Sequence, residues 1–237
     1  VTHVSNALGT IVPVKEVIRL AHEAGAKVLL DGSQAAPHRR VDVSALDVDF
    51  YAFTGHKVYG PSGIGVLYGK RDLLNAMPPY HGGGEMIRRV TFEETTYQDV
   101  PHRFEAGTPA IAEAIGLAAA LRYMEDVGLE AIEAHEAGLL SYATEQMSAI
   151  PGLVIYGRAS EKSSIVSFTM EGMHAHDIGT IVDRAGVAVR AGHHCAQPLM
   201  DRLGIPATAR ASFAIYNGPD DVDALVQALY KAKDIFG

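Results

Sequence analysis

Short apolar runs alternate with helical segments in the first part of the chain. Residues 28–30 and 48–53 have the length and composition of buried strands. Apolar residues recur at helical spacing between Pro13, which suits the start of a helix, and Gly25, which suits its end. With residues 1–5 as an opening strand, this alternation predicts an α/β fold with a mainly parallel sheet.

The pattern changes after residue 71. Residues 71–107 contain Pro78-Pro79 and three consecutive glycines, which predicts a long loop. Helices are expected over about 110–126 and 129–150, and the first is apolar on nearly all sides, which favours burial. Strands and helices then alternate to the end: strands near 154 and over 165–169, 187–190 and 209–215, and helices over 177–184 and from 220 onward.

These elements predict two domains. Residues 1–126 are expected to form the C-terminal part of a large domain with a linking helix, and residues 127–237 a small C-terminal α+β domain. Because the chain opens with Val1 inside an apparent strand, we expect it to be the later part of a longer chain that lacks its N-terminal part.

Composition excludes several classes of partner. With 48% hydrophobic and 20% charged residues, the 237-residue chain resembles an ordinary globular protein. A net charge of −8 without a basic run argues against nucleic acid and anionic membranes. No apolar stretch approaches the roughly 20 residues that a membrane-spanning helix needs. A single cysteine excludes an internal disulfide and suits a reducing compartment such as the cytoplasm.

Polar residues follow the predicted strands 28–30 and 48–53. Ligands of parallel sheets bind beyond the carboxyl ends of the strands. Asp31 ends the first strand and Lys57 follows the second. A lysine that holds an aldehyde as a Schiff base, with a carboxylate that keeps the same pyridine ring protonated, is typical of pyridoxal phosphate (PLP) binding. The alternatives are a helix-capping or loop carboxylate and a solvated loop lysine.

Four other polar residues at the predicted strand ends are candidate ligands of the same cofactor. Thr54 and His56, next to Lys57, could reach its phosphate. Asn6 or Gln34 could reach its ring hydroxyl.

Cys195 lies in a polar loop rather than in an apolar strand. The neighbouring His193 and His194, with Arg190 shortly before, would favour the thiolate, which is the nucleophilic form. A buried, inert thiol is the alternative. A zinc site is disfavoured because adjacent residues rarely face one metal together and no second thiol is present, so no metal is expected.

Arg210 interrupts the predicted strand 209–215. An arginine among apolar strand residues needs a partner, which a substrate carboxylate could supply through a bidentate contact. A structural salt bridge is the alternative.

Five segments together resemble one known family. They are THVSN at 2–6, VLLDGSQ at 28–34, TGHK at 54–57, RFEAGTP at 103–109 and RAGHHCAQP at 190–198. In this order they resemble the SufS-type (group II) cysteine desulfurases of the class V aminotransferase family, with the type I PLP-dependent transferase fold. The resemblance covers all 237 residues, and the last segment is the one specific to desulfurases.

The resemblance implies a role for each candidate. Lys57 would hold PLP and take the substrate's α-proton, Arg210 (with Asn6) would bind the carboxylate of L-cysteine, and Cys195 would attack its sulfur. The implied cofactor ligands are Asp31 at the pyridine nitrogen, Gln34 and Asn6 at the ring hydroxyl, Thr54 and His56 at the phosphate, and Thr108 at the phosphate in the partner subunit of a homodimer.

The implied activity converts L-cysteine to L-alanine with a persulfide on Cys195. The sulfur would pass to a SufE- or SufU-like acceptor for iron–sulfur cluster assembly. The alternatives are a selenocysteine lyase, an aminotransferase, which would give no role to Cys195, or an inactive fragment that only dimerises. Members of this family carry a longer N-terminal part with further cofactor contacts, so this polypeptide alone is expected to bind PLP poorly and to be inactive.

Overall fold

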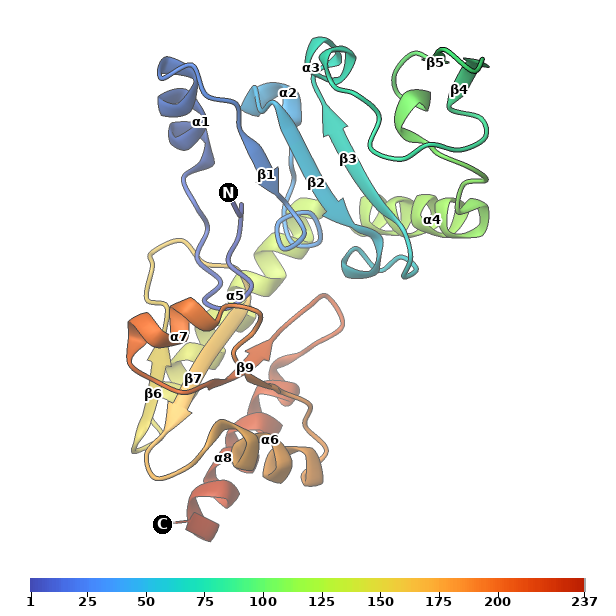
Figure 1. Ribbon diagram of the computed structural model, residues 1–237. Helices are drawn as coiled ribbons and strands as arrows, with labels where there is room; N and C mark the ends of the chain where they lie inside the picture. The colour runs from blue at the N-terminus through green and yellow to red at the C-terminus, as the bar shows by residue number, and fades with distance from the viewer. Residues whose placement is uncertain (237) are drawn as a thin grey trace. The chain divides into compact units, whose positions relative to one another are not determined.

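The computed structural model describes residues 1–236, and its contacts divide the chain into two units (Figure 1). The first unit contains Val1–His3, Pro13–Pro37 and Val41–Asp126. The second contains Val4–Val12, His38–Arg40 and the chain from Val127 onward. The predicted domain division after Asp126 stays a prediction, and two short segments from before that point group with the second unit.

The first unit is built on a three-stranded sheet in the order β1-β2-β3, formed by Leu29–Asp31, Phe50–Thr54 and Gly65–Gly69. β1 and β2 are parallel, as predicted, and β3 is antiparallel to β2. The sheet is therefore mixed in direction, because the short turn between β2 and β3 permits only a reversal of the chain.

The first residues of the chain extend this sheet beyond β1. Thr2 bridges Asp31 in parallel, and backbone hydrogen bonds of 2.9 Å join Asp31 to Val1 and His3. The predicted opening strand 1–5 is thus reduced to a single bridge at Thr2 with its two flanking hydrogen bonds, and residues 4–12 belong to the second unit.

Helices and a hairpin accompany the sheet of the first unit. They are α1 (Val14–Glu23), α2 (Val43–Leu46), the 3-10 helix η1 (Gly55–Lys57), α3 (Arg71–Ala76), the hairpin strands β4 (Ile87–Val90) and β5 (Thr95–Tyr97), the 3-10 helix η2 (His102–Phe104) and α4 (Ile111–Val127). As predicted, α1 follows Pro13 and ends before Gly25, whose φ of +73° is the left-handed conformation that glycine favours.

Two predictions for this unit are wrong. Residues 71–107 are not one loop, since they form α3 and the β4–β5 hairpin, whose strands are too short to leave a periodic pattern. The helix at 110–126 is present as α4, but Ile111 and Ile115 are 59% and 66% exposed. A helix that is apolar on all sides carries no polar stripe to mark its solvent-facing side, so the pattern cannot indicate how much of it is covered.

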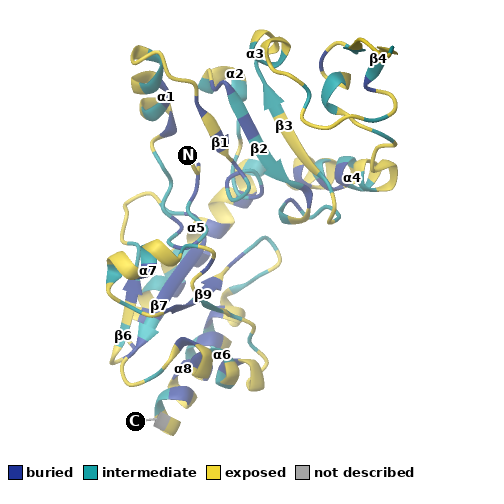
Figure 2. Cartoon of the chain, viewed as in Figure 1, coloured by how far each residue is buried: buried dark blue, intermediate teal, exposed yellow. Residues whose placement is uncertain are grey.

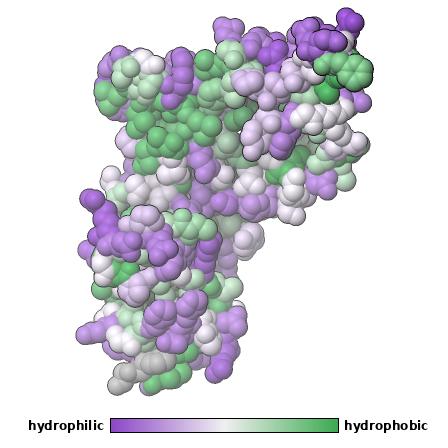
Figure 3. Space-filling view, in the orientation of Figure 1, coloured by the Kyte–Doolittle hydropathy of each residue, from purple (hydrophilic) through white to green (hydrophobic). Residues whose placement is uncertain are grey.

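Apolar side chains are also exposed elsewhere on the first unit. Figure 3 shows hydrophobic side chains on its surface around α1 and β1, where Val1, Leu20 and Leu29 are exposed. In Figure 2 most of β3 is likewise exposed, whereas Tyr51 in β2 is buried.

The second unit holds an antiparallel sheet in the order β6-β7-β9-β8. The strands are β6 (Leu153–Tyr156), β7 (Ile165–Met170), β8 (Arg190–Gly192) and β9 (Thr208–Ser212), and the helices are α5 (Leu129–Ser148), α6 (Ala175–Arg184), α7 (Gln197–Leu203) and α8 (Pro219–Phe236). The elements match the predicted ones except that β8 begins at the last residue of predicted strand 187–190, β9 ends three residues before 215, and α7 was not predicted.

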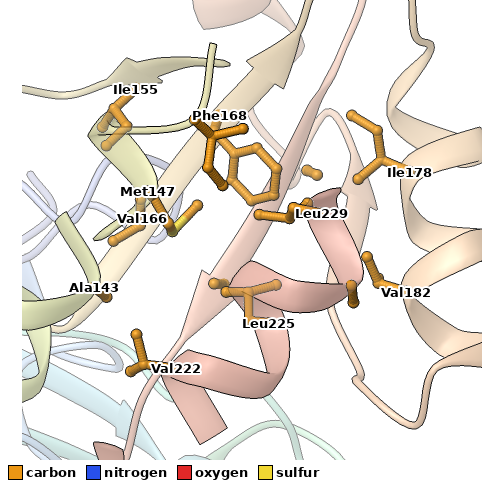
Figure 4. Close-up of a cluster of buried hydrophobic side chains, with 14 of the residues drawn as sticks. Ala143, Met147, Ile155, Val166, Phe168, Ile178, Val182, Val222, Leu225 and Leu229 are labelled. Atoms are coloured by element: carbon orange, nitrogen blue, oxygen red, sulfur yellow. The ribbon is translucent and has the colours of Figure 1, made fainter. Parts of the chain in front are cut away.

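The core of the second unit lies between its sheet and helices (Figure 4). Phe168 of β7 is fully buried and is packed among Ile178 of α6 and Leu225 and Leu229 of α8. This packing fixes β7, and β7 in turn pairs with β9, the strand that carries Arg210.

Two segments from the N-terminal part are bound to this unit through specific contacts. Ser167 Oγ in β7 donates a hydrogen bond to the carbonyl oxygen of Ala7. Residues 38–40 form ion pairs with three glutamates that lie one helical turn apart on α5. The pairs are His38–Glu136 at 2.8 Å, Arg39–Glu133 at 3.5 Å and Arg40–Glu130 at 3.4 Å.

The packing between β1 and β2 in the first unit can be tested at Gly32, which follows β1. A Cβ at Gly32 would lie 2.0 Å from the ring of Tyr51, whose hydroxyl meets His3 Nδ1 at 3.1 Å. We expect Gly32→Ala to lower the free energy of unfolding by about 1–3 kcal/mol in denaturant titrations, because the ring must shift. Gly82→Ala is the matched control, since nothing lies within 4 Å of its Cβ position. Equal effects in the two variants would contradict the packing described.

Candidate active site

The carboxyl ends of β1 and β2 bring the first group of candidates together. Asp31 is the last residue of β1, and Thr54 is the last residue of β2. The parallel register pairs Asp31 with Ala52, so both strands end at the same edge of the sheet. Lys57 follows Thr54 within η1, at this edge.

Asp31 and Lys57 are both available to a ligand. Asp31 is exposed, and its Oδ1 accepts a hydrogen bond of 2.9 Å from the backbone of Ser33. Lys57 is half-buried. Within residues 1–236, neither side chain forms an ion pair. A carboxylate and an amine at one sheet edge, each without an opposite charge, fit the two ends of a PLP ring.

The turn that carries Lys57 has a single tightly packed conformation. The backbone N–H of Gly55 donates to the carbonyl of Ile64 at 2.9 Å, and a Cβ at Gly55 would lie 2.7 Å from the side chain of Ile64. Helix α4 lies against the same turn, since a Cβ at Gly116 would be 3.2 Å from Pro61. Only glycine fits at position 55, which explains the glycine before His56 and Lys57.

Four further candidates occupy distinct positions. Thr54 Oγ1 and His56 Nδ1 are hydrogen-bonded to each other at 2.8 Å beside Lys57. Gln34 is half-buried in the turn after Asp31. Thr108 is exposed and follows Gly107, whose φ is +80°. The roles predicted for these residues stay predictions.

Arg210 and Asn6 belong to the second unit and contact one another. Arg210 Nη1 donates to the backbone oxygen of Asn6 at 2.6 Å, while its buried Nε has no hydrogen-bond partner among the described residues. The structural salt bridge considered above is not found, since no carboxylate of residues 1–236 pairs with Arg210. Burial, and then the charge of Arg190, lower the pKa of Arg210.

Arg190 in β8 lies directly across from Arg210 in β9. Like charges at directly paired positions of adjacent strands repel each other. An anion between or beside them removes this repulsion. The pair therefore favours a ligand that carries a carboxylate.

Cys195 is exposed in the loop after β8. Arg190 Nη2 donates a hydrogen bond of 3.4 Å to its Sγ. His194 and Cys195 have φ values of +55° and +58°, a left-handed conformation that is uncommon for side chains other than glycine. The thiol is therefore not buried, and its reactivity stays a prediction.

His194 differs from its predicted role. It was expected to line the loop beside the thiol, but it is 2% exposed, and its Nε2 lies 2.8 Å from Thr208 Oγ1 and 3.1 Å from Thr208 O. Asn6 Nδ2 donates to its carbonyl oxygen at 2.6 Å. Burial, followed by the charges of Arg210 and Arg190, lowers the pKa of His194 to about 4. No pattern in the sequence indicates this contact, which joins residues 14 positions apart.

Neither a metal site nor a membrane-spanning helix is found in the described part of the chain. No three or more His, Cys, Asp or Glu side chains gather there in a way that could hold a metal ion. None of the helices there has both the length and the apolar character needed to cross a lipid bilayer.

Comparison with known proteins identifies the family. Residues 1–225 match the family described as aminotransferase class-V. The chain belongs to the class-V aminotransferase family. Among curated relatives of this class-V chain are cysteine desulfurases of Dickeya dadantii, 53% identical over 238 residues, and of Haloferax volcanii, 51% identical over 237 residues. The chain spans 58% and 56% of their lengths, while they cover 100% of it.

Solved structures confirm the predicted fold of this class-V chain. The cysteine desulfurase CsdA of Escherichia coli superposes with a TM-score of 0.96 at 44% identity, over 100% of this chain and 59% of that one. A mutant of C-DES with glycine covalently linked to its PLP cofactor gives a TM-score of 0.84 at 25% identity, over 100% and 60% of the two chains. The SufS type, and the expected inactivity of this polypeptide alone, stay predictions.

The buried His194 makes stability depend on pH. Its pKa is about 4 in the folded protein and near 6.5 when unfolded, so below pH 6.5 the unfolded chain binds a proton that the folded protein does not. The stability present above pH 6.5 is lost as pH falls toward 4, by at most about 3 kcal/mol. We expect denaturant titrations of the wild type to show this loss of unfolding free energy. His194→Gln, which has no titrating group at position 194, should not show it. Curves that stay parallel between pH 6.5 and 4 would contradict it.

Proposed function

We propose that this class-V family member is a PLP-dependent cysteine desulfurase that converts L-cysteine to L-alanine and leaves the sulfur as a persulfide on Cys195. The observation that carries the proposal is the position of Asp31 and Lys57 at the carboxyl ends of two directly paired parallel strands. The names of its relatives, cysteine desulfurases at 51–53% identity, support the same activity.

The first unit would hold the cofactor. Lys57 would bind it through its amine, and Asp31 would pair with the ring nitrogen. Thr54 and His56 would bind the phosphate, and Gln34, with Asn6, the ring hydroxyl. When bound, PLP supplies an electron sink for the carbanion at the substrate's α-carbon. Lys57 is then the residue placed to take the α-proton.

The second unit would hold the substrate and supply the nucleophile. Arg210, with Asn6, would bind the substrate carboxylate, which also relieves the repulsion between Arg210 and Arg190. The Cys195 thiolate, beside Arg190, would attack the substrate sulfur. The S–S bond forms as the carbon–sulfur bond breaks, so that L-alanine and a protein persulfide account for all atoms of L-cysteine and the thiol.

We further propose the finer features of the SufS type. The protein would act as a homodimer in which Thr108 reaches the cofactor phosphate of the partner subunit. The exposed Cys195 would pass its sulfur to a SufE- or SufU-like acceptor for iron–sulfur cluster assembly. A reducing compartment such as the cytoplasm suits a thiol that must stay free.

Cofactor binding is tested with Lys57→Ala. We expect the full-length protein, purified with added PLP, to develop a visible absorption band that changes on addition of L-cysteine, and borohydride reduction to attach PLP covalently; the polypeptide of residues 1–237 alone is expected to give at most a weak band. Lys57→Ala should lose the covalent attachment, because no other amine replaces the one at this sheet edge. Lys70→Ala is the matched control, since Lys70 pairs with Asp47 at 2.6 Å. Dimerisation without any cofactor band would instead support the non-catalytic alternative.

The roles of Cys195 and Arg210 are separated by kinetics. We expect Cys195→Ala to lower the rate of alanine formation from L-cysteine by roughly 100-fold or more, since the attacking group is removed. Arg210→Ala should mainly raise KM, by about 10- to 100-fold, because a charge-assisted contact to the carboxylate is lost. Retained cleavage of selenocysteine by Cys195→Ala would indicate that one site serves both substrates. Full cysteine activity in Cys195→Ala would exclude the proposed mechanism.

A further inference from the structure

We propose that His194 is the positioning residue of the nucleophile loop, fastening the backbone beside Cys195 to β9 and to Asn6 through an uncharged imidazole. The proposed reaction gives no role to His194. The contacts of His194 nevertheless join two parts of the second unit, β9 and the segment that holds Asn6, to the residue that precedes the thiol.

The first contact is the side chain on β9. Nε2 lies 3.1 Å from the carbonyl oxygen of Thr208 and 2.8 Å from its hydroxyl oxygen. We assign the hydrogen to Nε2, because in that tautomer it can donate to the carbonyl oxygen, which can only accept. Nδ1 is then left without a proton; it is buried and has no hydrogen-bond partner among residues 1–236.

The second contact is through the backbone. The carbonyl oxygen of His194 accepts a 2.6 Å hydrogen bond from Asn6 Nδ2. The backbone oxygen of Asn6 in turn accepts from Arg210 Nη1 at 2.6 Å. The loop that presents Cys195 is thus tied to the arginine proposed to bind the carboxylate.

The backbone conformation requires such anchoring. His194 and Cys195 are consecutive left-handed residues, and Gly192 nearby has a φ of +126°. Such a conformation is unfavourable for residues with a Cβ and persists only where surrounding contacts hold it. Among residues 1–236 the exposed Cys195 has one side-chain hydrogen bond, from Arg190, and the turn itself is closed by a 2.9 Å bond from Ala196 N to His193 O. The buried His194 is the side chain that fastens this turn to the rest of the second unit.

An uncharged side chain is the one suited to this position. Arg210 and Arg190 both oppose a positive charge on His194, as does its burial, and they hold its pKa at about 4. A neutral imidazole therefore fills the space between β9 and the loop without adding to the two cations. Those cations remain directed at the thiol and at the proposed carboxylate.

The experiment is alkylation of the protein by iodoacetamide, which needs neither cofactor nor substrate. Cys195 is the single cysteine of the chain, so the rate reports one thiol. The amide nitrogen of glutamine can reach the position of the imidazole Nε2, whereas that of asparagine reaches only the position of Nδ1. We expect His194→Gln to react within twofold of the wild-type rate. His194→Asn and His194→Ala should react about fivefold more slowly or worse, since Sγ loses its fixed place beside Arg190.

His194→Asn separates two effects at position 194: the side-chain hydrogen bond to Thr208 and the preference of the residue for the left-handed backbone conformation. Asparagine adopts the left-handed conformation more readily than glutamine or histidine. If backbone preference alone mattered, His194→Asn would match the wild type and His194→Gln would not, and that result would overturn the proposal. A wild-type or faster rate in His194→Ala would overturn it as well.

Loss of overall stability is controlled by a variant in the hydrophobic core that contacts neither His194 nor Cys195 through a hydrogen bond. Val222→Ala removes buried volume from the core in α8 and is expected to lower the Tm while leaving the alkylation rate within twofold of the wild type. Slowing of alkylation in Val222→Ala to the level of His194→Ala would show that general instability, not the anchor, sets the rate, and would overturn the proposal.

The kcat of the His194 variants provides a second test of the positioning role, and this test rests on the proposed function. His194→Ala should lower kcat for L-cysteine and leave the PLP absorption band unchanged, and His194→Gln should restore kcat. These activities are measured in the full-length protein. If the alkylation pattern holds while neither the full-length wild type nor any variant releases alanine, the proposed function fails and the positioning role stands. The reverse pattern, with activity present and alkylation rates equal, removes the positioning role alone.

Discussion

Parallel pairing between β1 and β2 places the side chains of Asp31 and Lys57 at one edge of the sheet. Asp31 lies opposite Ala52, and the tight fit of Gly32 against the Tyr51 ring holds this register. Because side chains alternate between the faces of a strand, a shift of one residue would turn Asp31 to the opposite face. The amine and the carboxylate that a pyridoxal ring requires therefore depend on this register and on the closely packed turn at Gly55.

The second unit holds several polar side chains in partly or fully buried positions. Buried polar groups are tolerated when they are hydrogen-bonded to each other. Arg210, Asn6, His194 and Thr208 form such a series, with distances of 2.6–3.1 Å. Among residues 1–236 neither Arg210 nor the exposed Arg190 pairs with a carboxylate. For the half-buried Arg210 an unpaired charge is costly, and it is useful where an anionic substrate must bind. Cys195 is exposed at the end of this series.

Much of the fold could be predicted where local pattern and chain direction agree. The helix between Pro13 and Gly25 carries clear periodicity and end signals, and the apolar run at 28–30 stands out because polar residues follow it directly. The hairpin β4–β5 could not be predicted, because its strands of four and three residues leave no measurable period. The burial of α4 was predicted wrongly, because an alanine-rich helix has no polar face to reveal how much of it is exposed.

The sequence by itself determined the chemistry available to this protein. Its motifs identified one lysine, one thiol and one strand arginine in the order of a known family, and the family assignment is confirmed. Only the tertiary structure decided that His194 is buried against Thr208, that Asn6 bonds both Arg210 and the loop, and that two arginines face each other across β8 and β9. Those contacts join residues up to 204 positions apart. Local periodicity carries no information about which strands pair, so such long-range partners appear only once the sheet has formed.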